Sequence, residues 1–173
     1  MAACRNSLYS DFVSHFIIPI PYPIPTAEWN IYIDPLAAQI VFNQKIPIIL
    51  IPLDLTNQHP IDLNFYNALK INHQTPGASF IFTLLQKNLS MIKNKEWYFW
   101  DPLAAVIATN NSIAKFRDLR VKICIEPEDQ SGTIVIDEHN GKLVSVATQI
   151  NDHRFKWTLL GQHHALSAPS ANT

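Results

Sequence analysis

The pattern of apolar and polar positions along the chain predicts several strands. Residues 46–54, IPIILIPLD, are apolar without alternation, which is typical of a strand buried on both faces in a parallel sheet. Residues 120–126, RVKICIE, alternate between charged and apolar side chains, which predicts a strand with one solvated face. Two more strands are predicted at 133–137 and 142–148, joined by an Asn-Gly hairpin turn at 140–141.

Helices are predicted where apolar residues return to one side of a helical repeat or where a capping residue starts the pattern. A helix followed by a buried strand is half of an α/β repeat. The sequence therefore predicts an α/β fold with a mostly parallel, Rossmann-like sheet and a late antiparallel hairpin. The predicted helices cover residues 34–43, 61–71, 78–93 and 153–163, and another begins at Asp101.

The pentapeptide DPLAA occurs twice, beginning at Asp34 and at Asp101. Asp is a favoured helix N-cap because its carboxylate accepts a backbone N–H from the first turn, and Pro suits the first helical position. Each copy is predicted to begin a helix, with the Asp as a cap that stabilises it by about 1 kcal/mol. The shared letters alone leave open whether one of the two carboxylates also has a chemical role.

A length of 173 residues favours one domain, and a composition of 47% apolar and 16% charged residues favours a well-filled globular core. With 13 basic and 14 acidic residues, no basic patch indicates nucleic acid as a partner, and no segment has the length and apolarity of a membrane span. Residues 12–24 are apolar but interrupted by prolines, unlike a signal peptide, so a cytoplasmic location is expected. We expect an atypical segment at 1–24, a domain at 25–164 and a disordered tail at 165–173.

Two clusters combine residues that are able to carry chemistry. Glu28 and Asn30 flank Trp29 just before the first DPLAA; a carboxylate and a carboxamide suit sugar hydroxyls, but an exposed polar loop is the commoner explanation. The run WYFW at 97–100 precedes Asp101 and suits a stacking wall beside a charge, but core packing is the favoured explanation for these aromatics taken alone.

Taken in order, the segments AEWNIYIDPLAAQIVF, IPIILIPLDLTNQHP, WDPLAAVIA and EDQSGTIVID resemble the C-terminal half of the inosine/uridine-preferring nucleoside hydrolases. That family has an A-E-aromatic-N loop before a D-P-x-A-A helix, a buried strand that ends in L-D-x-T, and a later Asp at a helix start. The resemblance covers roughly residues 22–163, and it implies a partial nucleoside hydrolase-like fold.

The resemblance also implies roles for individual residues. Glu28 and Asn30 correspond to ribose-binding residues, and Trp29 to a position beside the same pocket. Asp101 corresponds to a ligand of a calcium ion, the implied cofactor, which leaves Asp34 as a cap. Many members have a histidine at the position of Trp100, and this histidine protonates the leaving base. Purine-preferring members instead have an aromatic residue there and stack the base between aromatics, and Trp100 resembles these.

The sequence departs from the family at its signature, because no D-x-D-x-x-x-D-D cluster is present and the start has a lone Asp11. That cluster supplies most calcium ligands and the general base, so no catalytic residue is assigned here. We expect a protein of the type that cleaves purine nucleosides to base and ribose, truncated and inactive alone. The alternative is a non-catalytic pseudoenzyme or dimerisation module that associates with a full-length relative; homo-oligomerisation is a further expectation.

Overall fold

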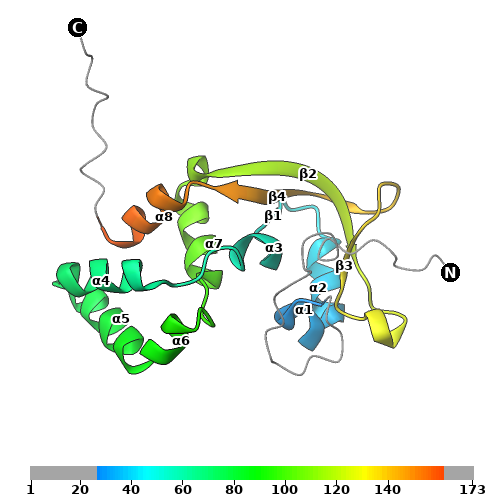
Figure 1. Cartoon of the computed structure of the whole chain (residues 1–173). Coiled ribbons are helices and arrows are strands. Elements are labelled where there is room, and N and C mark those ends of the chain that lie inside the picture. Colours follow the sequence, from blue (N-terminus) through cyan, green and yellow to red (C-terminus); the bar gives the residue numbers. More distant parts are fainter. Residues whose placement is uncertain (1–26, 162–173) are drawn as a thin grey trace, which may run out of the picture. The chain divides into compact units, whose positions relative to one another are not determined.

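The structure is a computed structural model that describes residues 27–161 (Figure 1). These residues form two compact units, one made of 27–55 and 115–149 and the other of 56–114 and 150–161. They are called unit 1 and unit 2 below, and each is described by itself. The expected atypical segment at 1–24, the expected tail at 165–173 and both expected domain borders lie outside the described residues.

Unit 1 is built on a four-stranded sheet with the order β1-β4-β2-β3. β1 is parallel to β4, with Ile49 opposite Ser145, and β2 is antiparallel to β3, with Val121 opposite Ile136. The α/β class and the presence of a late antiparallel hairpin are confirmed. The elements that contribute to this unit are α1 (Trp29–Ile33), α2 (Pro35–Phe42), β1 (Ile49–Leu50), α3 (Leu53–Thr56), β2 (Ala114–Ile123), η2 (Glu128–Gln130), β3 (Ile134–Ile136) and β4 (Lys142–Ile150).

The Asn140-Gly141 turn does not join two neighbouring strands, so the predicted pairing of residues 133–137 with 142–148 is wrong. β3 and β4 lie on opposite sides of β2, and the antiparallel hairpin is formed by β2 and β3 instead. Gly141 is needed for a close approach: a Cβ there would lie 2.5 Å from the carbonyl oxygen of Asp137 and 2.7 Å from the nitrogen of Val121. The missing side chain therefore lets the chain pass beside β2.

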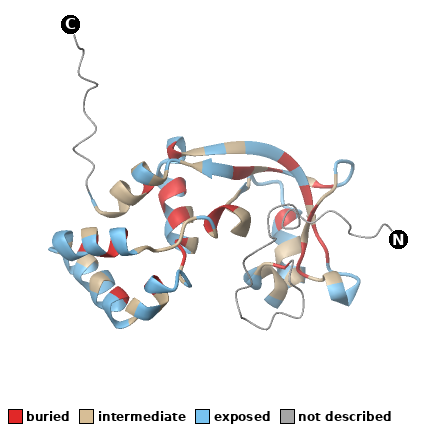
Figure 2. Cartoon of the chain, in the orientation of Figure 1, coloured by how far each residue is buried: buried red, intermediate tan, exposed pale blue. Residues whose placement is uncertain are grey.

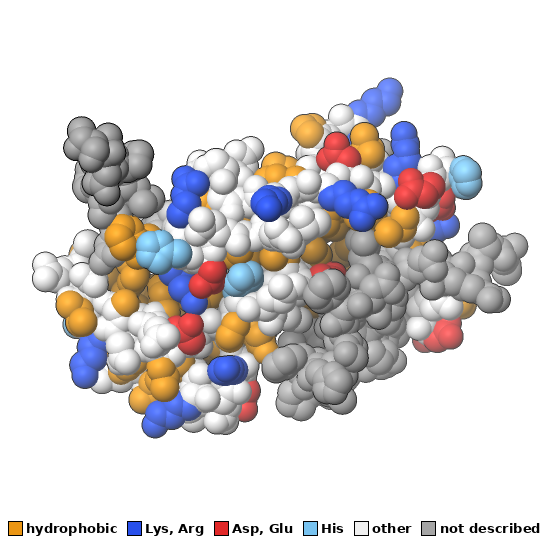
Figure 3. All heavy atoms as spheres, turned by 45° about the horizontal axis from the view of Figure 1, so that its top comes forward, with side chains coloured by type: hydrophobic (Ala, Val, Ile, Leu, Met, Phe, Trp, Pro, Cys, Tyr) orange, Lys and Arg blue, Asp and Glu red, His pale blue; other side chains and the backbone are white. Residues whose placement is uncertain are grey.

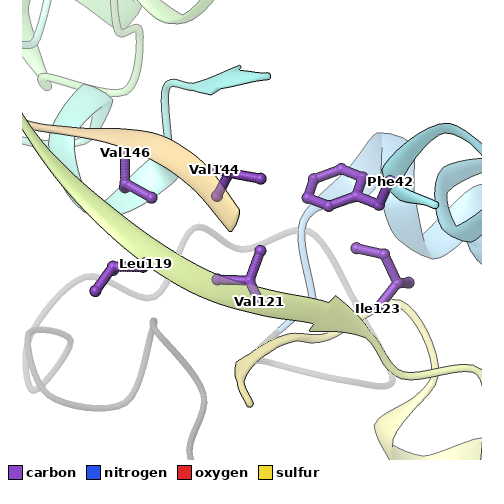
Figure 4. Packing of buried hydrophobic residues seen from close by; sticks show 6 residues of the cluster. All are labelled: Phe42, Leu119, Val121, Ile123, Val144 and Val146. Carbon is purple, nitrogen blue, oxygen red and sulfur yellow. The ribbon is translucent and has the colours of Figure 1, made fainter. Parts of the chain in front are cut away.

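The core of unit 1 lies between one face of the sheet and α2 (Figure 4). Ile48 and Leu50 of the predicted buried strand pack against this core, but Ile49 between them is 52% exposed. The expectation that this strand is buried on both faces is wrong for the described chain, because β1 is at the edge of the sheet and only one of its faces is covered. The core residues are Phe42, Leu119, Val121, Ile123, Val144 and Val146.

Unit 2 is helical. The predicted helix at 78–93 is divided at Asn88, which ends α5 and begins α6. Figure 2 shows that α5 is mostly exposed, and its one buried residue is Leu85, whereas α4 and α7 each carry three buried residues. Phe99 is 2% exposed and meets Phe65 and Phe155 edge-on, with ring centroids 4.9 and 5.1 Å away. The elements are α4 (Leu63–Asn72), α5 (Pro76–Lys87), α6 (Leu89–Lys93), α7 (Trp100–Thr109), η1 (Asn111–Ile113) and α8 (Asp152–Leu159).

No helix among residues 27–161 is long and apolar enough to cross a membrane. Acidic and basic side chains are interspersed on the face of the molecule seen in Figure 3. The cytoplasmic location stays a prediction.

Candidate functional site

The two DPLAA aspartates have different structural positions. Asp34 is the N-cap of α2, and its Oδ1 accepts a hydrogen bond of 2.9 Å from the backbone N–H of Ala37, as predicted. Asp101 is not a cap, because α7 already begins at Trp100 and Phe99 occupies the N-cap position without a side-chain bond. The Asp101 side chain is exposed, and its carboxylate makes no hydrogen bond or ion pair with the residues that the structure describes.

The buried position of Phe99 explains why α7 begins two residues earlier, relative to its DPLAA segment, than α2 does. Its ring is fixed in the core of unit 2, and its backbone N–H donates to the carbonyl of His59 at 3.2 Å. The carbonyl of Phe99 then accepts the N–H of Leu103 at 3.1 Å, which is the first helical bond. Asp101 is thereby displaced into the first turn, where a negative charge is favourable but no cap bond is made.

Glu28 and Asn30 are held together at the start of α1. Oε2 of Glu28 caps the helix by accepting the Ile31 N–H at 3.1 Å, and Oε1 accepts the Asn30 Nδ2–H at 3.0 Å. Each carboxylate oxygen has a second lone pair, and the Asn30 carboxamide keeps its oxygen and one N–H. The pair therefore presents adjacent donors and acceptors, a combination that suits vicinal hydroxyl groups.

Trp29 lies between these two residues in the sequence and is 46% exposed. Its ring is tilted against that of Tyr32 at a centroid distance of 6.4 Å. A half-exposed indole beside polar groups offers an apolar surface for a ring. Glu28, Trp29 and Asn30 are thus brought together at one end of α1 in unit 1.

Trp100 is tied to the polar loop that follows α3. Its indole Nε1–H donates to Oδ1 of Asn57 at 3.0 Å. The backbones are paired nearby as well, because Pro60 and Tyr98 form an antiparallel bridge and the N–H of Ile61 donates to the carbonyl of Trp97 at 2.8 Å. The start of α7 and the loop after α3 are therefore one structural feature of unit 2.

The aromatic run 97–100 divides between core and site. Tyr98 and Phe99 are 6% and 2% exposed, so core packing is the right interpretation for these two. Trp100 is partly exposed, and its ring is tilted against that of Tyr98 with centroids 5.4 Å apart. Trp97 is partly exposed as well, so Trp97, Trp100 and the neighbouring, exposed Asp101 remain accessible to a ligand.

A charged network connects α8 to the polar loop that follows α3. Nδ1 of His59 lies 3.0 Å from Oδ1 of Asp152, and Nζ of Lys156 lies 3.0 Å from carboxylate oxygens of both Asp152 and Asp62. Burial acts to raise the pKa of Asp62, but the Phe65 N–H and Lys156 outweigh it and lower this pKa below its ordinary value. Burial likewise acts to lower the pKa of Lys156, yet the two carboxylates raise it.

Two polar residues of α3, the buried Thr56 and the partly buried Asp54, were not singled out as site residues from the sequence. Thr56 is 3% exposed, and its Oγ1 has no hydrogen-bond partner among the described residues. Burial raises the pKa of Asp54 to about 6. Buried polar groups are usually paired, so the Thr56 hydroxyl, one residue before Asn57, is a candidate for ligand contact. In the sequence, Asp54 and Thr56 could have been recognised as the polar positions of the segment LDLT, which directly follows an apolar run.

The described residues do not by themselves complete a calcium site. Calcium takes six to eight oxygen ligands, and no group of three or more His, Cys, Asp or Glu side chains in residues 27–161 has the geometry for a metal. Asp101 offers a single carboxylate.

Sequence comparisons relate the chain to nucleoside hydrolases. It matches the family described as inosine-uridine preferring nucleoside hydrolase over residues 22–157. Nucleoside hydrolase 3 of Arabidopsis thaliana is 32% identical over 111 residues, which are 61% of this chain and 12% of the relative. The pyrimidine-specific ribonucleoside hydrolase RihA of Salmonella arizonae is 36% identical over 78 residues, which are 43% of this chain and 24% of the relative.

Solved structures share the fold. An inosine-uridine preferring nucleoside hydrolase from Bacillus anthracis aligns with a TM-score of 0.66 at 28% identity, covering 79% of this chain and 44% of that one. A purine-preferring ribonucleoside hydrolase from Gardnerella vaginalis aligns with a TM-score of 0.61 at 21% identity, covering 78% of this chain and 45% of that one. The chain therefore spans less than half the length of each of these four proteins.

Proposed function

The chain belongs to the inosine-uridine preferring nucleoside hydrolase family, and from this premise we propose that it supplies the nucleoside-contacting side chains of an N-glycosidic hydrolase. In the reaction, water adds across the bond between ribose and base, so that ribose gains the hydroxyl and the base gains the proton. Glu28 and Asn30 bind the ribose, and Trp29 and Trp100 contact the base. This sequence holds no residue that we assign as general base.

The hydrogen-bonded pair of Glu28 and Asn30 is the observation that carries this proposal. The 3.0 Å bond between their side chains fixes both groups at one end of α1, and the cap to Ile31 restricts the carboxylate further. Pre-positioned polar groups bind a ligand without first losing side-chain freedom. Two adjacent ribose hydroxyls are able to donate to the carboxylate and to exchange hydrogen bonds with the carboxamide.

Purine preference is proposed from Trp100. Its partly exposed indole is held by Asn57, which suits stacking on a base more than transfer of a proton. The relatives include both pyrimidine-specific and purine-preferring enzymes, so membership of the family leaves the base open. Asp101 is proposed as one carboxylate ligand of a calcium ion whose remaining ligands lie outside the described residues.

A non-catalytic role is the second candidate. It is favoured by the lack of a three-residue metal group within residues 27–161 and by the missing Asp cluster of the sequence. In that role the protein binds nucleosides, or a full-length relative, without turnover.

Two experiments test these proposals. The purified chain, supplied with calcium, is expected to release no ribose from inosine, guanosine or uridine in a reducing-sugar assay. In a chimera that joins the remaining part of the Bacillus anthracis enzyme to this chain from Tyr22 onward, turnover of inosine is expected. Glu28→Gln should lower kcat/KM by about 10- to 100-fold, since a hydrogen bond to a charged group contributes roughly 1.5–3 kcal/mol. Asn30→Ala should lower it by about 2- to 10-fold, since a neutral hydrogen bond contributes roughly 0.5–1.5 kcal/mol.

Asp34→Asn is the matched control in the chimera, because it lies in the same segment, is exposed, and Asn caps a helix as well as Asp. Its kcat/KM should equal that of the parent chimera. An active chimera in which Glu28→Gln and Asn30→Ala leave kcat/KM unchanged would refute the ribose assignment. Ribose release by the unmodified chain that disappears with Asp101→Ala would refute its expected inactivity.

A further inference from the structure

The indole ring of Trp100 is restrained at two places within unit 2. At its edge, Nε1–H donates to Oδ1 of Asn57 at 3.0 Å. The indole nitrogen is a donor only, so the carboxamide presents its oxygen to it. The ring of Tyr98 lies beside the indole, with centroids 5.4 Å apart and an angle of 41° between the two planes. The restrained ring stays partly exposed, so it is fixed in orientation and still accessible to a ligand.

The loop that carries Asn57 is itself anchored. The N–H of His59 donates to the carbonyl of Thr56 at 3.0 Å and closes a turn around Asn57. The carbonyl of His59 accepts the N–H of Phe99 at 3.2 Å. Because Phe99 directly precedes Trp100, backbone hydrogen bonds hold the acceptor and the donor of the indole bond at a fixed separation. Asn57 is therefore a pre-positioned acceptor for the indole.

The bond to Asn57 occupies the single hydrogen-bond donor of the indole. The part of the ring that is left for a ligand is its π surface, and every nucleobase has a π face that stacks on such a surface. Stacking depends on the area that a base covers, and it does not depend on the donors and acceptors at the edge of the base. A purine has two fused rings and covers more of the indole than a pyrimidine does.

We propose that Asn57 is a positioning residue for the base: it holds the edge of Trp100 and so makes a fixed stacking surface that selects bases by ring size. This inference rests on the proposed function, in which Trp100 contacts the base. A side chain that is already fixed does not lose rotational freedom when the ligand binds, so the fixed orientation adds affinity. Inosine, guanosine and adenosine should stack equally well, because Trp100 has no donor left that could distinguish their substituents.

The test measures the binding of inosine, guanosine, adenosine and uridine to the full chain by isothermal titration calorimetry. Asn57→Ala should weaken the binding of the three purine nucleosides by about 2- to 10-fold, because the indole must then be immobilised during binding, and it should weaken uridine binding less. Asn57→Asp keeps an acceptor oxygen for the indole and should restore the parent affinity to within about twofold. Asn67→Ala, at an exposed position of α4, is the matched control and should bind as the parent does.

Two further measurements separate the indole bond from a general effect on the fold. In a Trp100→Phe background, which has an aromatic ring but no N–H, Asn57→Ala should cause no further loss of affinity. In proton–nitrogen NMR spectra, the indole N–H signal of Trp100 should shift and exchange faster with water in Asn57→Ala, but not in Asn67→Ala. Equal losses from Asn57→Ala and Asn67→Ala, an added loss in the Trp100→Phe background, or no recovery with Asn57→Asp would overturn the proposal.

Trp100→Ala distinguishes failure of this inference from failure of the proposed function. It should weaken inosine binding by about 5- to 100-fold if the base stacks on the indole. Such a loss, together with unchanged inosine binding by Asn57→Ala, would overturn the positioning role alone. Unchanged binding by Trp100→Ala, or no saturable binding of inosine by the parent chain, would overturn the base contact and this inference with it.

Discussion

Replacing each DPLAA aspartate by alanine separates a structural cap from a carboxylate that the helix does not use. Asp34→Ala removes the 2.9 Å bond to the Ala37 N–H, a loss of about 1 kcal/mol. Asp101→Ala removes no cap bond. It loses a first-turn charge worth about 0.3–1 kcal/mol, which the better helix propensity of Ala offsets by up to ~0.7 kcal/mol. The net cost at Asp101 should be near zero.

Urea unfolding followed by far-UV circular dichroism measures this difference. With a urea dependence of about 2 kcal/mol per molar, Asp34→Ala should lower the unfolding midpoint by about 0.5 M. Asp101→Ala should lower the midpoint by no more than about 0.2 M, although the local sequence is the same, because Asp101 makes no cap bond that could be lost. Amide exchange gives a local check: the Ala37 amide should exchange faster in Asp34→Ala, whereas the equivalent amide of Ala104 should be unchanged in Asp101→Ala.

The functional counterpart uses the conservative variants in the chimera. Asp34→Asn should keep full turnover, and Asp101→Asn should abolish it, since a neutral amide replaces the carboxylate that we propose as a ligand. Equal losses of stability from the two alanine variants would refute the structural reasoning. Equal losses of turnover from the two asparagine variants would refute the proposed role of Asp101.

Three more perturbations follow from the packing, charges and hydrogen bonds of the structure. Phe155 is fully buried against Phe99, so Phe155→Ala should lower the free energy of unfolding by about 3–5 kcal/mol in urea titrations; a loss below about 1 kcal/mol would contradict this packing. Burial raises the pKa of Asp54 from 3.8 to about 6, so the folded state favours the protonated carboxyl. The resulting stabilisation is complete below pH 3.8 and is lost as the pH rises through about 6. Asp54→Asn should remove that part of the pH dependence, and an unchanged pH profile would argue against it. A double-mutant cycle of Trp100→Phe and Asn57→Ala should give a coupling of roughly 0.5–1.5 kcal/mol for the indole bond, whereas additive losses would show that the bond contributes nothing.

Much of the candidate site is encoded locally. Asp34 caps α2 through a bond that spans three residues, and Glu28 contacts Asn30 and Ile31 within the same short distance along the chain. Interactions of this range depend on the identity of neighbouring residues and on the helical backbone. For this reason the sequence predicts the start of the first DPLAA helix correctly.

The helix breaks and strand positions were harder to predict. The apolar pattern at 78–93 predicts one helix, but the structure has two: α5 ends and α6 begins at Asn88. The apolar run at 46–54 predicts a strand, and a strand is present, but no periodicity specifies whether it has one neighbour or two. The Asn-Gly pair at 140–141 favours a hairpin by its turn chemistry, and the close approach of Gly141 to β2 takes the chain elsewhere.

The sequence by itself determined the α/β class, the cap at Asp34 and the family resemblance. Only the tertiary structure decided that Asp101 is not a cap, because Phe99 is fixed by aromatic rings from Phe65 and Phe155, distant in the chain, and thereby sets where α7 begins. Local hydrogen bonds depend on a few adjacent residues. Burial depends on segments that the fold brings together over long sequence distances, and identical pentapeptides therefore acquire different roles.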